Sequence, residues 1–376
     1  MIGIITVMGI YWISTSQTPE PRLSPSETAL PFADELEAAL ENGLQLYGGK
    51  GISAAVIMPG YDPWIGVSGI SHADTLIKQD SLFSAGSITK NFIAVVVLQL
   101  SEEGIIDLDD PLHKWLQDYP YVDNTITIRQ LLSHTGGIYD FVRHPDFWDA
   151  VFSDQDRVWD IDDVLVNYLF EPYFPASTGW HYSSGGYSLL RMIIQEATGS
   201  DVSTEIRKRI LDPMGLEDTF YVLEESLPRP VAHGWFDLNG DDEYDDLSGE
   251  PTPAFYSAIG GGIFITAEDL VRWTHALYHD KEVVSAQLLK QMLDFYNVND
   301  PSEPLVAGYG LGVVLFSPEL FNGEEIWGHG GNAIGYAAAS LYLPEYGASM
   351  AVLVNTEHGE SMSTINDIIT IITSGN

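Results

Sequence analysis

Hydrophobic and polar positions near the start of the chain predict one helix followed by a hairpin. Apolar residues recur at mostly helical spacing among Glu and Asp over residues 32–46, which predicts an amphipathic helix. Two short apolar runs, 51–58 and 64–70, are separated by a turn rich in Pro and Gly and predict two paired strands. An apolar-rich segment then runs from Ser87 to Gly104. Because Gly is typical of a helix C-terminus, this segment predicts a buried central helix.

The middle and the end of the chain carry different patterns. Between residues 108 and 220, helical pieces are separated by Pro and Gly, which predicts an all-helical insert. From Ala258 onward short β-like runs return, interrupted by helices near 266–279 and 284–295 and followed by one at 361–373. We expect the strands from the two ends of the chain to form one sheet. Runs of strands with helices at the ends indicate an α+β fold rather than a series of βαβ units.

These patterns divide the chain into three predicted parts, which are a signal-like segment and linker at 1–28, an α/β domain made of 29–107 plus 221–376, and an inserted helical domain at 108–220. The apolar run from Ile2 to Ile13 is too short to span a membrane and suits the core of a signal peptide. No Lys or Arg precedes this run, and no clear cleavage site follows it. Export to the periplasm or the medium is favoured over a buried N-terminal strand or an uncleaved anchor, and no stable membrane span is predicted.

The composition narrows the class of partner. The 376 residues include 54 Asp and Glu but only 16 Lys and Arg, so the formal net charge is -38. Binding to nucleic acid or to an anionic membrane depends on Lys and Arg, and both are therefore disfavoured. This acidity keeps a protein soluble by self-repulsion and is compatible with a saline habitat. Cys is absent, so any nucleophile is an oxygen or an amine, and disulfides and thiolate metal sites are excluded.

Ser87 and Lys90 are the first candidates for chemistry. They are three residues apart at the start of the predicted central helix, so their side chains share a face. A serine hydroxyl is a weak nucleophile until a neighbouring base takes its proton, and a Lys desolvated inside an apolar helix can be that base. The helix N-terminus adds free N–H groups where an oxyanion would develop. Such a spacing also arises by chance, so the pair alone is a weak indication.

Two Gly-rich segments later in the chain carry further candidates. Residues 179–186 (GWHYSSGG) place Tyr182 and Ser184 on a turn of small residues before a helix, where a phenol and a hydroxyl can project into a cleft. Residues 327–332 (WGHGGN) follow a strand-like run. Glycines inside a strand mark a place where another group approaches the backbone closely, and a substrate laid along this edge would explain them.

The order S-x-x-K, then Y-S-S, then H-G-G resembles the serine hydrolase family that includes class C β-lactamases, D-alanyl-D-alanine carboxypeptidases and related carboxylesterases, over about residues 35–372. The stretches ITIRQLLSHTGG and AIGGGIFITAEDLVRW are also similar to this penicillin-binding-protein-like family. The resemblance implies a β-lactamase/transpeptidase-like fold, with an antiparallel sheet flanked by helices and an inserted helical domain. It also implies acyl-enzyme chemistry without a metal or an organic cofactor, on a small-molecule or short-peptide substrate.

The resemblance implies a role for each matching residue. Ser87 matches the acylated nucleophile, Lys90 its base partner and Tyr182 the second proton-transfer residue. The position of His329 is often held by Lys in the K-T-G motif of the family. The backbone N–H groups of Ser87 and Asn332 would form the oxyanion hole. The substrate-binding side of the site is then predicted to contain Ser184, His329, Gly330, Gly331 and Asn332.

Two departures from the commonest family pattern bear on the substrate. Ser184 replaces the Asn of Y-x-N and offers no amide to a peptide carbonyl, while His329 replaces the strand Lys. A neutral His offers a hydrogen bond rather than a permanent cation, so recognition of a carboxylate should weaken as pH rises. We therefore expect hydrolysis of esters or of D-amino-acid peptides and amides, with weak or slow turnover of β-lactams. The alternatives are a true class C-type β-lactamase and a non-catalytic peptidoglycan-binding module on the same fold.

Three other patterns imitate functional sites. His134, in H-T-G, follows a helical run with no flanking strand, so a structural role is favoured. His275 and His279 are four residues apart on a predicted helix, but the Glu of H-E-x-x-H is missing, so a capping or dipole role is favoured over metal binding. Residues 237–243 alternate oxygen ligands like a calcium loop. Because Asp242 stands where an EF-hand needs Gly, a solvated acidic turn is favoured over a calcium site.

Overall fold

The computed structural model describes most of the chain beyond its N-terminal segment. The described residues are 28–47, 49–228, 231–241, 243–259, 261–356 and 360–374. Apart from Thr28, the predicted signal-like segment and linker lie outside these ranges. Within them, no helix has both the length and the apolar character needed to cross a membrane.

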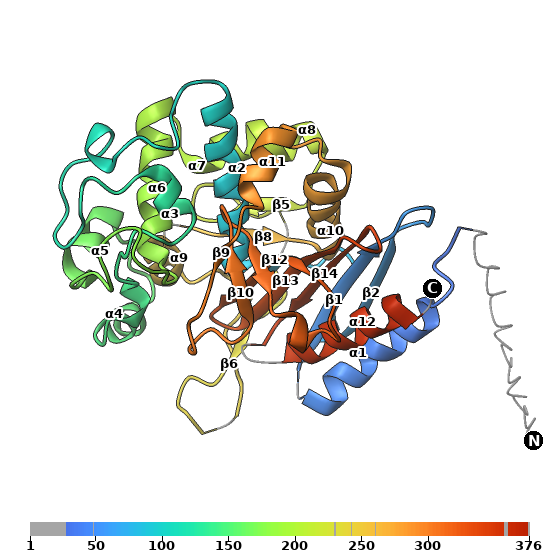
Figure 1. Cartoon of the computed structure of the whole chain (residues 1–376). Coiled ribbons are helices and arrows are strands. Elements are labelled where there is room, and N and C mark those ends of the chain that lie inside the picture. Colours follow the sequence, from blue (N-terminus) through green and yellow to red (C-terminus); the bar gives the residue numbers. More distant parts are fainter. Residues whose placement is uncertain are drawn as a thin grey trace, which may run out of the picture.

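One antiparallel sheet forms the centre of the molecule (Figure 1). Its nine strands lie in the order β3 (Thr75–Leu76), β2 (Trp64–His72), β1 (Gly51–Ile57), β14 (Ala348–Val354), β13 (Tyr336–Leu343), β12 (Trp327–Ala333), β11 (Val314–Phe316), β10 (Val306–Tyr309) and β9 (Tyr296–Asn297). Strands from the two ends of the chain are neighbours in this sheet. The prediction that strands from both ends of the chain share one sheet and the α+β fold class are therefore confirmed.

The pairing of β1 with β14 joins the two ends of the chain directly. Ile52 lies opposite Val354 in an antiparallel register. Side chains alternate across a strand, so Val56 belongs to the core on one face of the sheet and Ala55 to the core on the other. Both strands are buried over almost their whole length. This two-sided burial explains why these segments are continuous apolar runs in the sequence.

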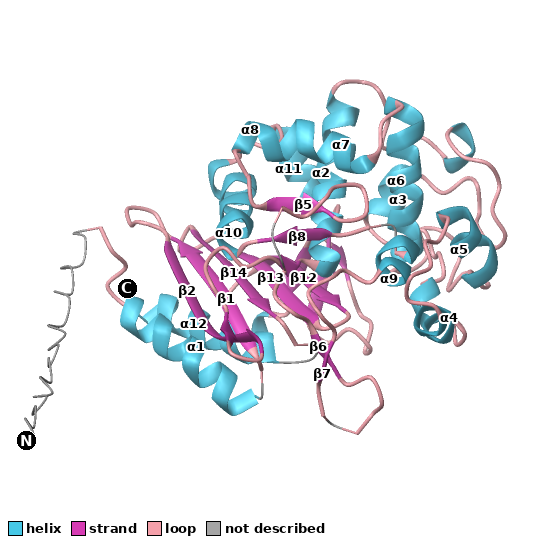
Figure 2. Cartoon of the chain, turned by 180° about the vertical axis from the view of Figure 1, so that it is seen from behind, coloured by secondary structure: helices cyan, strands magenta, loops and turns pink. Residues whose placement is uncertain are grey.

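Helices cover both faces of the sheet. On one face α1 (Ala33–Tyr47) and α12 (Glu360–Ser374) lie side by side (Figures 1 and 2). Leu36 of α1 and Ile369 of α12 are fully buried in the core that they share with the sheet. On the opposite face, α10 (Ala267–His275) packs against β1, β13 and β14. The three helices predicted in these segments are therefore present.

Most of the other helices gather beyond one end of the sheet (Figure 1). They are α2 (Thr89–Glu102), α3 (Ile128–Leu132), α4 (Phe147–Ser153), α5 (Ile161–Tyr168), α6 (Ser184–Thr198), α7 (Val202–Ile206), α8 (Asp212–Met214), α9 (Pro253–Ala258) and α11 (Ala286–Met292). The central helix α2 is buried over almost its whole length and packs against α6 and α7. The helices α3 to α8 come from the stretch predicted to be helical, whereas the boundaries of a separate inserted domain stay a prediction.

Two features of the strands were not expected from the pattern. A second, three-stranded sheet joins β4 (Phe83–Ser84), β8 (Ile263–Ile265) and β5 (Thr219–Tyr221). The run at 309–316 is one apolar segment in the sequence but contributes to two antiparallel strands, β10 and β11. The backbone reverses between them at Gly312, whose φ of 76° is readily adopted only by glycine.

The described residues of the acidic segment, 237–241 and 243, lie in the loop between β6 (Trp235–Phe236) and β7 (Asp245–Asp246), which extends away from the body of the molecule (Figure 1). The Asp237 Oδ1 atom accepts the N–H of Gly240 at 2.7 Å. This is the short-range side-chain bonding that Asp provides in turns. The choice between a solvated acidic turn and a calcium site stays a prediction.

Candidate active site

Ser87 and Lys90 lie together where a single 3₁₀ turn leads into the central helix. Ser87 is the middle residue of η1 (Gly86–Ile88), and Lys90 is the second residue of α2. The Lys90 Nζ atom donates a hydrogen bond to the Ser87 Oγ atom at 3.2 Å. Lys90 is only 9% exposed within this buried helix. The spacing of three residues thus places the amine beside the hydroxyl, as expected.

Hydrogen bonds to β8 fix the turn that carries Ser87. The Ala85 N–H donates to the Ile263 carbonyl oxygen at 2.8 Å. The Ile263 N–H donates in turn to the Thr89 Oγ1 atom at 3.0 Å. These bonds hold the chain on both sides of Ser87. The backbone at Ser87 is therefore fixed in position, and with it the attachment point of the hydroxyl group.

Asn91 anchors α2 immediately after Lys90. Its buried amide nitrogen donates to the Tyr278 hydroxyl at 3.0 Å and to the Gly312 carbonyl oxygen at 2.9 Å. Its amide oxygen accepts the Trp273 indole N–H at 2.9 Å. Because both polar atoms of this buried amide have hydrogen-bond partners, its burial leaves no polar group unsatisfied. The same bonds fix the rotation of the helix about its axis. That rotation directs Lys90 toward Ser87.

Strand β12 passes very close to the same turn. A Cβ atom added at Gly331 would lie 2.0 Å from the Ala85 carbonyl oxygen and 3.3 Å from the Ser87 nitrogen. One added at Gly86 would lie 2.7 Å from the Asn332 nitrogen. Both positions therefore require glycine. This approach brings together the backbones of Ser87 and Asn332, whose N–H groups are the predicted oxyanion hole.

Tyr182 reaches the Ser–Lys pair from the segment before α6. The Lys90 Nζ atom lies 5.0 Å from the centroid of its ring, within the range of a cation–π contact. The Tyr182 hydroxyl is buried and has no hydrogen-bond partner among the described residues. Leaving such a group unsatisfied costs about 1–3 kcal/mol. Tyr182 lines a pocket, and this hydroxyl is the candidate proton-transfer group beside Lys90.

His134 lies behind Tyr182, with the two ring centroids 4.4 Å apart. The Tyr309 ring is also close to it, at 4.6 Å. The His134 Nδ1 atom accepts the Ser183 N–H at 3.2 Å, so the neutral ring carries its proton on Nε2. Burial, followed by the nearby charge of Lys90, lowers the pKa of His134 well below its usual value. His134 is thus a neutral packing partner of Tyr182, in line with the structural role expected for it.

A pocket of about 210 Å³ opens beside these residues. Its lining contains five of the predicted site residues, namely Ser87, Lys90, Tyr182, Ser184 and Asn332. Apolar and aromatic side chains form much of the remaining wall, among them Ile93, Val142, Trp148, Phe255, Ile259 and Ile334. Apolar walls with a few convergent polar groups are typical of small-molecule sites.

The pocket also contains a carboxylate that the sequence analysis missed. Asp140 is 3% exposed, and its Oδ1 atom accepts the Ser184 N–H at 2.9 Å. Burial raises the pKa of Asp140, while the bond to Ser184 opposes this effect. The carboxylate thereby caps the N-terminus of α6, where a negative charge is favourable. No local motif marks Asp140, because its burial depends on the packing of α6 against this segment.

His329 lies on the strand predicted for it, β12, but its side chain is buried outside the pocket lining. It is 4% exposed and is not among the residues that line the pocket. Its Nε2 atom lies 3.0 Å from the Tyr309 hydroxyl, and its Nδ1 atom bonds to the Gly330 carbonyl oxygen. The rings of Tyr309 and Tyr182 pack around it at centroid distances of 5.9 and 6.3 Å. Contact between His329 and a substrate carboxylate therefore stays a prediction, since the described structure has the imidazole packed against these two rings.

The surroundings of His329 favour the neutral imidazole expected near pH 7, and they extend this neutral form to lower pH. Burial, together with the nearby Lys90, lowers the pKa of His329 to about 4, while the hydrogen bond to Gly330 opposes this. The imidazole is therefore neutral throughout the physiological range. It cannot cause a change in carboxylate recognition near pH 7.

The other predicted residues of β12 contribute through the backbone. Gly330 and Gly331 do not line the pocket, but Gly331 allows the close approach to Ala85. In the part of the chain that the structure describes, the single group of three metal-type ligands, which is His275, His279 and Asp280, also lies outside the pocket lining.

The antiparallel sheet with helices on both faces, and the Ser–Lys pair at the start of a buried helix, define a serine hydrolase of the β-lactamase and penicillin-binding-protein fold. The chain belongs to the Beta-lactamase family, whose model matches residues 36–372.

Individual relatives include different kinds of hydrolase. The chain is 29% identical to penicillin-binding protein 4* of Bacillus subtilis (strain 168) over 293 residues, which are 75% of this chain but only 62% of that protein. It is 24% identical to esterase EstB of Burkholderia gladioli over 290 residues, or 66% of this chain and 71% of the esterase. The crystal structure of a D-stereospecific amidohydrolase from Streptomyces sp. matches with a TM-score of 0.76 and 29% identity, covering 89% of this chain and 98% of that one.

Proposed function

We propose that this protein hydrolyses short esters and D-aminoacyl amides or peptides through an acyl-enzyme on Ser87. The observation that carries the proposal is the 3.2 Å hydrogen bond from Lys90 Nζ to Ser87 Oγ at the wall of a mostly apolar pocket. A nucleophile, a neighbouring base and a nearby pair of backbone N–H groups are the parts that acyl transfer needs.

In the proposed first step, the Ser87 Oγ atom attacks the carbonyl carbon of the substrate. Its proton passes to Lys90, and the Ser87 and Asn332 N–H groups stabilise the negative charge that develops on the carbonyl oxygen. Lys90 passes this proton through Tyr182 to the leaving alcohol or amine as the bond to it breaks, so that both groups return to their starting states. Water then attacks the acyl-enzyme, which releases the carboxylic acid and restores the Ser87 hydroxyl.

The pocket wall supports an apolar acyl group. Trp148 and Phe255 contribute aromatic surface, and Ile93 and Ile334 contribute aliphatic surface. Ser184, which lines the same pocket, has a short side chain and leaves space where a longer Asn would extend. The esterase and the D-stereospecific amidohydrolase among the relatives support the two substrate classes.

Slow turnover of β-lactams is part of the proposal. His329, which stands where the family often has Lys, is neutral and buried behind Tyr182 and Tyr309. No cation from this position is therefore available to the carboxylate of a β-lactam. We expect nitrocefin to acylate Ser87 and to be released slowly.

The test compares p-nitrophenyl acetate, the p-nitroanilides of D- and L-phenylalanine and nitrocefin on the purified protein, with intact-protein mass spectrometry after each. We expect ester hydrolysis, preference for the D-anilide and a long-lived nitrocefin adduct that Ser87→Ala lacks. The matched control is Ser81→Ala, a nearby serine that does not line the pocket and should retain activity.

Two outcomes would overturn the proposal. If nitrocefin reaches a kcat/KM of about 10⁷ per molar per second while the esters are ignored, the protein is a true β-lactamase. If neither turnover nor a covalent adduct appears, the non-catalytic binding module is the better interpretation.

A further inference from the structure

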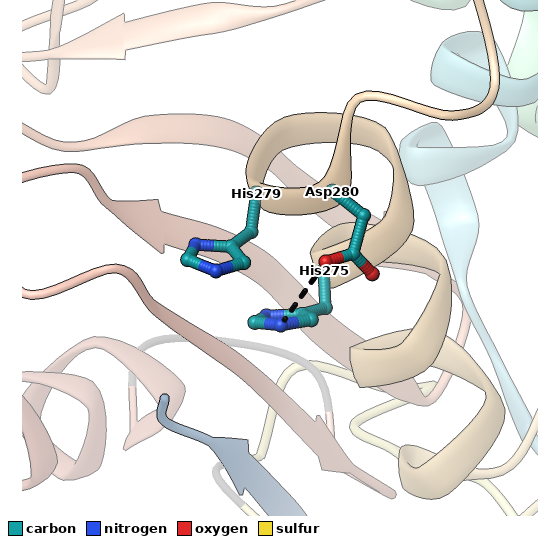
Figure 3. Close-up of side chains that lie close together, drawn as sticks. All are labelled: His275, His279 and Asp280. Atoms are coloured by element: carbon teal, nitrogen blue, oxygen red, sulfur yellow. Dashed lines mark ion pairs between the residues drawn. The ribbon is translucent and has the colours of Figure 1, made fainter. Parts of the chain in front are cut away.

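Two histidines and an aspartate converge at the end of α10, outside the pocket described above (Figure 3). His275 is the last residue of α10, and His279 and Asp280 belong to the π-helical turn η5 (Ala276–Asp280) that follows. One ligand atom from each residue lies within 4.8 Å of the other two. The two imidazole rings are stacked, with centroids 4.3 Å apart and planes 19° apart.

The π-helical turn explains how Asp280 joins the two histidines. In an α-helix the fifth residue along faces a different side, whereas a π-helix bonds residue i to i+5 and brings them into line. Asp280 is five residues after His275, and its Oδ1 atom lies 3.8 Å from the His275 Nε2 atom. Single π-helical turns cost helix stability and frequently occur at functional sites.

Side chains of the adjacent sheet form hydrogen bonds with the Nδ1 atom of each imidazole ring. The His275 Nδ1 atom bonds to the Ser349 Oγ atom at 3.0 Å, and the His279 Nδ1 atom bonds to the Tyr342 hydroxyl at 3.3 Å. Ser349 and Tyr342 lie directly opposite each other in the β13–β14 ladder. Such bonds fix the tautomer and the orientation of metal-binding histidines, and they leave both Nε2 atoms for an ion.

We propose that His275, His279 and Asp280 form a binding site for a borderline divalent transition-metal ion, with Zn²⁺ as the representative. Two imidazoles and one carboxylate are a ligand set that Zn²⁺ accepts, with water completing the coordination. The hard ions Ca²⁺ and Mg²⁺ prefer oxygen ligands and do not fit this set. Asp280 is 44% exposed, so its side chain can rotate the short distance needed to close around the ion.

The site would have a structural role. It joins the end of α10 to strands β13 and β14, and none of its residues lines the pocket that contains Ser87. An ion that binds only the folded protein stabilises it, so Zn²⁺ should raise the melting temperature. The sequence favoured a capping role for His279. The bond from its Nδ1 atom to Tyr342, a residue of the sheet, is the observation that changes this interpretation.

The experiment measures Zn²⁺ itself, on full-length protein made without a His tag and dialysed against EDTA. Competition with a chromophoric chelator gives the stoichiometry and the dissociation constant. We expect one tight site per chain, and at least about tenfold weaker binding in His279→Gln, which keeps the net charge of the acidic surface unchanged. Tyr342→Phe should weaken binding by about 10- to 100-fold, because it removes only the bond that orients His279.

His113→Ala is the matched control, because this exposed histidine lies outside the cluster and its loss should not change binding. A thermal melt of each variant verifies that it is folded and should show a Zn²⁺-dependent rise in wild type and His113→Ala only. The proposal is overturned if wild type has no saturable site, or if His279→Gln binds Zn²⁺ as tightly as wild type. Neither result depends on hydrolase activity.

Discussion

The Nε2 atom of His329 lies 3.0 Å from the hydroxyl of Tyr309, and this buried hydrogen bond joins β12 to β10 behind the pocket. The Nδ1 atom of the same ring bonds to the Gly330 carbonyl oxygen. A neutral imidazole satisfies both partners, donating at Nδ1 and accepting at Nε2. A protonated ring would place a second N–H and a positive charge in the same buried position.

His329 should therefore make the fold sensitive to acid. Burial lowers its pKa in the folded protein to about 4 from an unfolded value of 6.5. Above pH 6.5 both states are largely neutral. As pH falls from 6.5 toward 4 the unfolded state takes up the proton first, so the free energy of unfolding decreases by at most about 1.4 kcal/mol per pH unit from this group. Urea unfolding at pH 7 and pH 5 measures the decrease.

His329→Gln isolates this contribution, since other groups also titrate in this range. Its free energy of unfolding should decrease less between pH 7 and pH 5 than that of the wild type. Equal decreases in the two proteins would show that His329 does not carry the effect.

Gly331 and Gly330 offer a matched pair of substitutions in β12. The Cβ atom of Gly331→Ala would lie 2.0 Å from the Ala85 carbonyl oxygen, whereas that of Gly330→Ala would lie 4.0 Å from its nearest neighbour, the Ala338 carbonyl oxygen. Gly331→Ala should displace β12 from Ser87 and lower kcat by about 100-fold or more, as expected for a lost oxyanion donor. Gly330→Ala should stay within about threefold of wild type. Steady-state ester hydrolysis tests this, and equal effects would contradict it.

Tyr182→Phe should reduce activity without reducing stability. The ring keeps its contact with His134, and the hydroxyl that is lost has no partner among the described residues. Loss of a proton-transfer group lowers kcat by about 10²- to 10⁴-fold. Tyr336→Phe should do the opposite, because its buried hydroxyl donates to the Ala232 carbonyl oxygen at 2.6 Å, and losing this bond costs about 1 kcal/mol. Measuring the melting temperature and kcat of each variant separates the effect on stability from the effect on activity. If Tyr182→Phe has wild-type activity, Tyr182 has no part in the mechanism.

Substitutions at Ser87 and Lys90 should have non-additive effects on the turnover rate. Ser87→Ala should remove essentially all turnover, and Lys90→Ala should slow acylation by several orders of magnitude. In the double variant the loss should match that of Ser87→Ala alone, because the two groups act as one unit. Stopped-flow acylation with a p-nitrophenyl ester gives the rates. Losses that multiply across the two substitutions would mean that the Lys90 amine acts independently of Ser87.

The net charge of -38 should make the fold more stable in salt. Salt screens repulsion among exposed carboxylates, with a Debye length that falls from about 10 Å at 0.1 M to about 3 Å at 1 M. The melting temperature is therefore expected to rise from low to molar NaCl, with little change in the acylation rate. A flat or falling melting temperature would argue against self-repulsion as a significant cost.

Local patterns in the sequence predicted the features that depend on nearby residues. The hairpin at 51–70 and the helix after Ser87 follow from periodicity, and the Ser87–Lys90 contact follows from a spacing of three residues on one helix. The presence of strands from both ends of the chain in one sheet could be predicted as well. Strands with apolar residues on both faces belong to the interior of a sheet that is covered on both faces.

Features that depend on distant partners could not be predicted in this way. The orientation of His329 is decided by Tyr309, which belongs to a different strand, and the burial of Asp140 is decided by α6. The converging ligands of His275 and Asp280 require a π-helical turn, which shifts the register that an α-helical pattern assumes. In each case the residue type was visible in the sequence and its surroundings were not.

The β1–β14 pair also sets an order of events during synthesis. Contacts between residues far apart in sequence form slowly, because a long loop must close before they contribute. Ile52 leaves the ribosome long before its partner Val354. Strand β12, which completes the surroundings of Ser87, is also made long after Ser87 itself. A growing chain therefore carries Ser87 and Lys90 for a long stretch of its synthesis without the strand that completes the pocket around them.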